Sequence, residues 1–126
     1  MPRTRILLFR EANGRLPVRE WLAELGRRDP KAAAKCVDRV ERLAAMGFEL
    51  RRPEADLLRD GIFELRIRRG HVNLRILYFF HGKDVAVLAH ALTKEEVVPE
   101  ADIRLAWVRR RLVEEDPRRH LHGDES

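Results

Sequence analysis

Apolar and polar residues alternate with a period of two through much of the stretch between Gly61 and Lys94. The alternation covers residues 63–68, resumes over residues 72–80 after a glycine-containing turn, and is followed by a third apolar run that begins at Val85. A period of two turns successive side chains to opposite faces of a β-strand. The pattern therefore predicts three consecutive strands joined by two tight turns.

Arginines occupy polar positions of the first two of these strands. Glu64 and Arg66 lie on the first strand, and Arg75 lies on the second. Because burying an unpaired guanidinium is very costly, we expect Arg66 and Arg75 to share a solvent-accessible face of the sheet. That face is the first place to look for a functional site. An ordinary solvated side chain, or an ion pair with Glu64, is the alternative explanation for either arginine.

Helical periodicity flanks the strands on both sides. Apolar residues spaced i, i+3, i+4 and i+7 predict a helix that begins at Pro17 and is closed by Gly26. A second helix is predicted over residues 30–46, with Asp29 as its N-cap. The short polar link between the two helices predicts an antiparallel helical hairpin. A third helix is expected to begin at Pro99, with acidic residues in its first turn.

The remaining segments complete a single domain. Residues 3–10 hold a short apolar run that suits a first strand, and residues 48–60 are expected to form a loop. Residues 116–126 are expected to be a flexible tail after a domain that spans residues 1–115. The order of elements predicts an α+β fold, in which a mainly antiparallel sheet of about four strands carries the helical hairpin on one face and is followed by a C-terminal helix.

Composition narrows the classes of function. The 126 residues include no apolar run long enough to span a membrane and no signal-peptide pattern. The single cysteine, Cys36, cannot form an intramolecular disulfide, so a reducing, cytoplasmic setting is expected. The net charge of +5 comes mainly from arginine, whose planar fork suits phosphates and bases. This favours a nucleic acid or an acidic protein as partner, although an arginine-rich host composition would give the same balance.

Several segments of the chain carry a further signal. The strongest are the stretch from Leu57 to Arg66 and the segment Leu74-Arg75-Ile76-Leu77-Tyr78. The others lie at residues 15–18, 21–22, 47–50, 90–94 and 98–99, so that together the segments cover most of residues 4–112. In their order and spacing they resemble the RelE/HigB superfamily of bacterial toxins, and within it the phage-derived Gp49-like group of HigB type.

The resemblance implies a small RelE-like sandwich and a toxin of a type II toxin–antitoxin system. It implies a translation-inhibiting mRNA endonuclease that acts at the ribosome without a metal or other cofactor. In that reaction the RNA 2′-hydroxyl attacks the adjacent phosphate, and the product is a 2′,3′-cyclic phosphate. The resemblance also implies a cognate antitoxin, commonly a helix-turn-helix protein of the HigA kind, as a partner beside mRNA and ribosomal RNA.

The resemblance points to candidate catalytic residues. Arg75 matches the family's catalytic strand arginine, Arg66 matches a basic position on the preceding strand, and Lys94 matches a basic position after the last strand. The resemblance implies that Arg75, with Arg66 across from it, orients the phosphate and stabilises its developing charge. Lys94 would bind phosphate or donate the proton to the leaving group. His90 is the best remaining proton carrier, with a partly buried, hydrogen-bonded strand histidine as the alternative.

A second group of residues are candidates for contact with RNA or the ribosome: Arg68, Arg69, His71 and Glu64. Glu64 is also a candidate general base, with a structural ion pair as the alternative. His120 and His122 lie in a stretch too irregular for metal-ligand spacing, so no metal site is expected.

Two other functions stay open. A ParE-like protein of the same fold would inhibit DNA gyrase without cleaving nucleic acid, and a degenerate toxin would only bind an antitoxin or RNA. Lys94 is followed by Glu95 where relatives often carry a second lysine, and Glu100 stands about where some carry a tyrosine. These differences keep the degenerate toxin open, whereas Arg66 and Arg75 favour the endonuclease.

Overall fold

The chain folds as a strand, two helices, four further strands, two more helices and a short last strand. The structure, a computed structural model, describes residues 3–94 and 97–123. Its elements are β1 (Arg5–Phe9), α1 (Pro17–Arg28), α2 (Pro30–Met46), η1 (Gly47–Glu49), β2 (Ala55–Arg59), β3 (Ile62–Arg69), β4 (Val72–Phe80), β5 (Val85–Lys94), α3 (Glu100–Glu115), α4 (Pro117–His120) and β6 (Leu121–His122).

The six strands in the described part of the chain form one sheet in the order β2-β3-β4-β5-β1-β6. Neighbouring strands are antiparallel except β1 and β5, which run parallel with Arg5 opposite Val85 and Leu8 opposite Leu88. The α+β class is confirmed. The sheet is mixed and has six strands rather than about four, because β2 and β6 form in segments that were expected to be a loop and a tail.

β2 is a strand that the alternation of apolar and polar residues does not predict. Its residues 55–59 do not alternate, but the pair Asp60–Gly61 follows them directly. Asp60 and Gly61 both have positive φ, 52° and 76°, as a two-residue type I′ hairpin turn requires. Arg59 pairs with Ile62 across this turn. The Asp-Gly pair, and not the apolar pattern, is therefore the sequence feature that indicates the strand.

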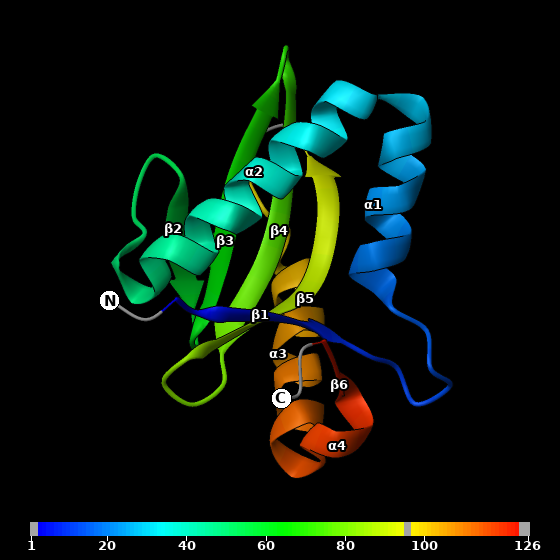
Figure 1. Ribbon diagram of the computed structural model, residues 1–126, viewed down its shortest axis with the longest axis vertical. Coiled ribbons are helices and arrows are strands. Elements are labelled where there is room, and N and C mark those ends of the chain that lie inside the picture. Colours follow the sequence, from blue (N-terminus) through cyan, green and yellow to red (C-terminus); the bar gives the residue numbers. More distant parts are fainter. Residues whose placement is uncertain (1–2, 95–96, 124–126) are drawn as a thin grey trace.

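Helices cover both faces of the sheet (Figure 1). α1 and α2 pack on one face, over a core that includes Leu25 and Leu65. α3 packs on the other face, over a core that includes Leu77 and Ile103. Because β4 has helices on both sides, residues 74–79 form a continuous buried run instead of an alternation.

The helix boundaries follow local signals. The Asp29 carboxylate accepts a hydrogen bond from the backbone N–H of Ala32 at 3.2 Å, which confirms Asp29 as the N-cap of α2. α1 continues past Gly26 to Arg28, because the backbone leaves the helical conformation only at Asp29. No helix within the described ranges is long and apolar enough to cross a membrane.

The segment after residue 115 is ordered as far as it is described. β6 pairs with β1 through Leu121 opposite Phe9. The His120 ring is buried, stacks on the Phe9 ring at 5.6 Å between centroids, and donates from Nδ1 to the Arg10 carbonyl at 2.8 Å. The flexible tail expected from residue 116 is therefore wrong up to Gly123, while residues 124–126 lie outside the described residues.

Burial of two acidic groups predicts that the fold is sensitive to alkali. Burial raises the pKa of the Cys36 thiol from 9.0 to about 11, and that of the Tyr78 hydroxyl from 10.0 to about 12. The folded state thus binds these protons more tightly than the unfolded state. Their contribution to the free energy of unfolding is therefore fully present below about pH 9 and is lost as the pH rises through the folded-state pKa values. We expect urea denaturation to show about 2–3 kcal/mol less stability at pH 11 than at pH 8 from Cys36 alone. Cys36→Ala should flatten the first part of this decline, and an unchanged decline in that variant would contradict the assignment.

Candidate functional site

Strand register places the predicted site residues in adjacent rows across β3, β4 and β5. The first row pairs Glu64 with Leu77 and Leu77 with His90. The second row pairs Arg66 with Arg75 and Arg75 with Leu92. The third row consists of Arg68, Asn73 and the backbone of Lys94, whose side chain lies outside what the structure describes.

A β-bulge turns the His90 side chain to the face of the sheet on which α3 packs. Leu77 pairs with His90 while the next residue, Tyr78, pairs with Leu88, so Ala89 is an extra residue in β5. Ala89 packs in the core beneath α3, and His90 contacts α3 as well, so two successive residues of β5 face the same side. Strict alternation would have turned His90 toward α1 and α2.

α3 covers only part of this face of the sheet. In Figure 1, α3 lies behind the end of the strands farther from the β3–β4 turn, and on this rear face no helix lies behind the half nearer that turn, whereas α1 and α2 lie on the front face. The open face, as we call the uncovered part, carries Arg66 and Arg68 on β3, with Asn73 on β4 between β3 and the end of β5. Arg75 lies beneath it.

Arg75 and Glu64 form a buried ion pair. Their residues are only 5% and 8% exposed, and Arg75 Nε lies 2.8 Å from Glu64 Oε1. The expectation that Arg75 is solvent-accessible is therefore wrong. Only an unpaired guanidinium is too costly to bury; here the guanidinium is paired, and the Glu64 carboxylate, two residues before Arg66, compensates its charge. In this structure Arg75 faces Glu64 rather than an open phosphate site.

Arg66 and Arg68 are the cations that remain available on the open face. The Arg66 guanidinium is half-buried and has no hydrogen bond or ion pair within residues 3–94 and 97–123. Arg68 is exposed, and within the described residues its side chain donates from Nε to the Gly70 carbonyl at 3.1 Å. Both guanidinium groups therefore keep donors for a bidentate contact with an anion.

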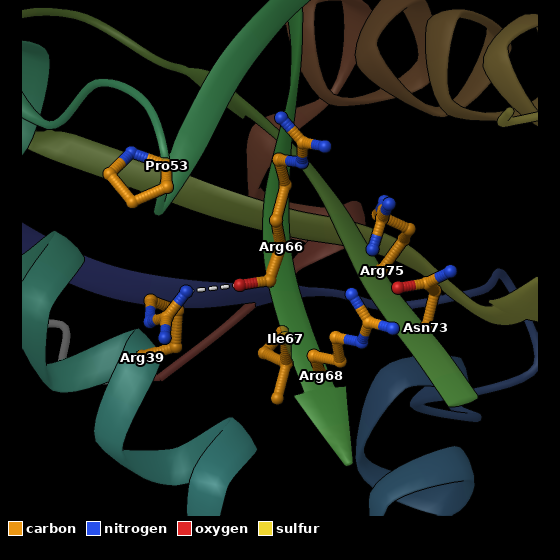
Figure 2. A pocket seen from close by; sticks show the side chains of 7 residues that line it. All are labelled: Arg39, Pro53, Arg66, Ile67, Arg68, Asn73 and Arg75. Carbon is orange, nitrogen blue, oxygen red and sulfur yellow. Dashed lines mark hydrogen bonds between the residues drawn. The ribbon is translucent and has the colours of Figure 1, made fainter. Parts of the chain in front are cut away.

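These arginines line a pocket of ≈ 300 Å³. Figure 2 shows the side chains of Arg66, Arg68 and Arg75 turned away from α2, with Asn73 beside them on β4. Arg39 of α2 reaches the pocket from the other side and donates to the backbone carbonyl of Arg66. The remaining lining residues are Pro53 and Ile67. Arg39 could not be predicted from the sequence as a residue of this site, because only the fold brings α2 to it, whereas the alternation along β4 already puts Asn73 on the same face as Arg75.

His90 forms a dyad with Asp102 in the first turn of α3. His90 Nε2 lies 2.6 Å from Asp102 Oδ1, and both side chains are mostly buried. An ionised carboxylate only accepts hydrogen bonds, so Nε2 carries the proton and Nδ1 is left for exchange with another group. Asp102 was missed as a site residue. Its only signal in the sequence is its place in the first turn of the last helix, which the helix macrodipole explains equally well.

Two predicted contact residues lie apart from the open face. Arg69 Nε lies 3.2 Å from Asp29 Oδ2, so Arg69 ties β3 to the N-terminus of α2 on the other side of the sheet. His71 is exposed in the β3–β4 turn.

The described residues contain no group of three His, Cys, Asp or Glu side chains able to hold a metal ion.

Comparison with known proteins bears on the same residues. The sequence model of a family described as phage derived protein Gp49-like (DUF891) matches residues 21–111, a range that contains Arg66, Arg75, His90 and Asp102. A search of curated proteins found no match. Because the family match spans well over half of the 126 residues, the chain belongs to the phage-derived Gp49-like protein family.

Proposed function

We propose that this protein is the toxin of a type II toxin–antitoxin system and cleaves mRNA. Membership of the Gp49-like family is consistent with such a toxin. One observation of the structure supports the chemistry: Arg66, a cation without an ion pair among the described residues, lies one row from the His90–Asp102 dyad, on the part of the sheet face that α3 leaves uncovered. A phosphodiester needs a cation and a proton carrier of this kind.

The spacing of the two groups suits one phosphodiester. Arg66 and His90 are two strands apart and in neighbouring rows. This places their Cα atoms roughly 10 Å apart across the sheet and roughly 7 Å apart along it. Side chains that extend from both positions would reach a phosphate held between them. A phosphate held there by Arg66 and Arg68 would lie beside Nδ1 of His90.

The proposed reaction needs no group beyond the RNA and the protein. The 2′-hydroxyl loses its proton and attacks the adjacent phosphorus, the bond to the 5′-oxygen breaks, and that oxygen takes up a proton. Arg66 and Arg68 stabilise the added negative charge on the phosphate. His90 exchanges one of the two protons through Nδ1, while Asp102 keeps the ring in the tautomer that leaves Nδ1 free. Ribosomal positioning would contribute by holding the attacking oxygen in line.

The buried ion pair takes a supporting role in this scheme. Arg75 lies directly opposite Arg66, and Glu64 is two residues from Arg66 on the same strand. The pair is close to neutral, so it leaves the open face positive without adding a free charge. In this scheme the buried pair of Arg75 and Glu64 stabilises the part of the sheet that carries Arg66.

We further propose that the partners are a helix-turn-helix antitoxin, mRNA and the ribosome. The arginine-lined pocket and the net charge of +5 suit the phosphates of RNA. An RNA-binding module without cleavage is the second candidate, because Arg75, the expected catalytic arginine, is buried against Glu64.

Arg66→Gln tests the proposal most directly. Induced expression of the wild-type chain in bacterial cells is expected to arrest translation and to create new RNA 5′-hydroxyl ends within translated frames. Arg66→Gln is expected to reduce the frequency of these ends about 100-fold, because the substitution removes a charged donor to the phosphate. Arg28→Gln is the matched control: Arg28 is an exposed arginine of α1, on the other face of the sheet, and its loss should leave cleavage unchanged.

The same experiment separates the other functions. Intact message together with inhibited DNA supercoiling would identify a gyrase inhibitor and overturn the proposal. Intact message with RNA retained on the purified protein would identify the binding module. Cleavage at the wild-type rate in Arg66→Gln would show that the open face is not the reaction site.

A further inference from the structure

Two side chains on α3, seven positions apart, contact neighbouring residues of β5. Asp102 accepts from His90 Nε2 at 2.6 Å, and Arg109 Nη1 donates to the Ala89 carbonyl oxygen at 2.7 Å. Long side chains on a helix point back toward its N-terminus. Arg109 can therefore reach back along α3 to the residue next to the one that Asp102 contacts. One helix thus holds both the histidine and the peptide group before it.

The Ala89 carbonyl needs such a donor because of the bulge. Ala89 is the extra residue of β5, is fully buried, and lies beyond the last β1–β5 pair, Leu8 with Leu88. A bulge disrupts the ladder hydrogen bonds locally. A buried carbonyl left without a partner would favour a regular strand over the bulge. The hydrogen bond from Arg109 removes that penalty for the bulged conformation.

Arg109 is itself held in place. Its guanidinium lies over the Phe9 ring, 5.0 Å from the centroid, and Nη2 is 3.7 Å from Glu11 Oε2. The side chain is only 12% exposed. An arginine that served only for solubility would extend into water instead. The aromatic ring and the carboxylate orient its donors toward the bulge.

We propose that Arg109 is a positioning residue for His90. By binding the Ala89 carbonyl it stabilises the bulge that turns His90 toward Asp102, on the same side of the sheet as Arg66. In a regular strand His90 would face α1 and α2, and the dyad would not form. The catalytic consequence rests on the proposed function, whereas the effect on His90 does not.

The direct test is the state of the His90 ring in Arg109→Met, which keeps an apolar stem and removes every donor. Imidazole ¹H–¹⁵N NMR of the purified chain should show wild-type His90 with its proton on Nε2. In folded Arg109→Met the His90 resonances are expected to move to those of a histidine without the Asp102 contact. Val113→Ala, a cavity in the buried face of the same helix, is the matched control and should leave them in place.

Unchanged His90 resonances in folded Arg109→Met would overturn the proposal. If that variant does not fold, Phe9→Leu carries the test, because it removes the ring that orients the guanidinium. A shift of His90 in the same direction but of smaller size supports the proposal, and no shift overturns it.

Cleavage provides a separate readout. Arg109→Met should reduce RNA cleavage at least 10-fold under conditions in which it and Val113→Ala are both folded, with Val113→Ala within 2-fold of the wild type. Cleavage by folded Arg109→Met at the wild-type rate would overturn the positioning role. If the wild-type chain cleaves no RNA, the proposed function fails, while the NMR result still decides whether Arg109 positions His90.

Discussion

Arg75→Ala is expected to lower the free energy of unfolding by about 3–5 kcal/mol, because it leaves the Glu64 carboxylate buried without its cation. Glu64 is 8% exposed, and its ion pair with Arg75 is the contact that compensates its charge. Urea denaturation at pH 7, monitored by circular dichroism, measures the loss. Arg66→Ala is the matched control, since Arg66 is the cross-strand neighbour of Arg75 and has no ion pair in the described chain. Its effect should stay below about 1 kcal/mol.

The double variant Glu64→Gln, Arg75→Met separates charge from packing. It removes both charges and keeps similar volumes, so it should recover a large part of the stability that Arg75→Ala loses. A double variant as unstable as Arg75→Ala would show that the loss comes from packing. A stability of Arg75→Ala close to that of the wild type would show that Glu64 is protonated or solvated, contrary to the buried pair.

This prediction affects how activity data are interpreted. Loss of RNA cleavage in Arg75→Ala is expected whether or not Arg75 touches the phosphate, because the variant will be partly unfolded or distorted beneath Arg66. The resemblance to known toxins points to Arg75 as the catalytic arginine, whereas burial points to Arg66. Only variants measured under conditions where they are folded can decide between these two residues.

His90→Asn is expected to reduce RNA cleavage by about 100- to 10,000-fold, the range for removal of a general acid or base. The asparagine amide can keep a hydrogen bond to Asp102 but cannot exchange a proton at neutral pH. The fold should survive, because asparagine is no larger than histidine and keeps the hydrogen bond to Asp102. His71→Asn is the matched control: His71 lies in the exposed β3–β4 turn, and its replacement should leave the rate within about 2-fold.

A substrate with sulfur in place of the 5′-oxygen at the cleavage site identifies which proton His90 transfers. A thiolate leaves without being protonated, so this substrate should restore the rate of His90→Asn if His90 is the general acid and should not restore it if His90 is the base. Cleavage of ordinary RNA by His90→Asn at a rate near that of the wild type would show that the dyad carries neither proton and is structural.

Local signals determined much of the fold. Asp29 and Pro30 set the start of α2 because capping and ring geometry act within one turn of helix. The alternation over residues 63–68 placed Glu64, Arg66 and Arg68 on one face, and the register confirms Arg66 opposite Arg75. The Asp60–Gly61 pair is also a local signal, because it indicates the turn that follows β2. The alternation of apolar and polar residues alone does not predict that strand.

Other features depend on contacts between segments far apart in the chain. The partner of Arg75, and with it the burial of an arginine expected in water, follows from how β3 lies against β4. The segment that forms β6 is ordered because it pairs with β1, which lies more than a hundred residues away in the sequence. Neither could be deduced from the residues of one segment, because each depends on the neutralisation or burial that a distant segment provides.

The sequence by itself determined the α+β class, the helical hairpin and the shared face of Arg66 and Arg75, because spacing and capping depend on neighbours along the chain. The tertiary structure alone decided which residues become the proton carrier and the free cation. His90 reaches the α3 side of the sheet through a bulge whose carbonyl is bound by Arg109, and it meets Asp102 because α3 crosses β5 at that residue. Among the described residues Arg66 has no ion pair, because Glu64 is already engaged by Arg75 and Asp56 by Arg52. These outcomes depend on the tertiary structure because a hydrogen bond or an ion pair forms only with a partner at short distance, and the fold determines which partners are that close.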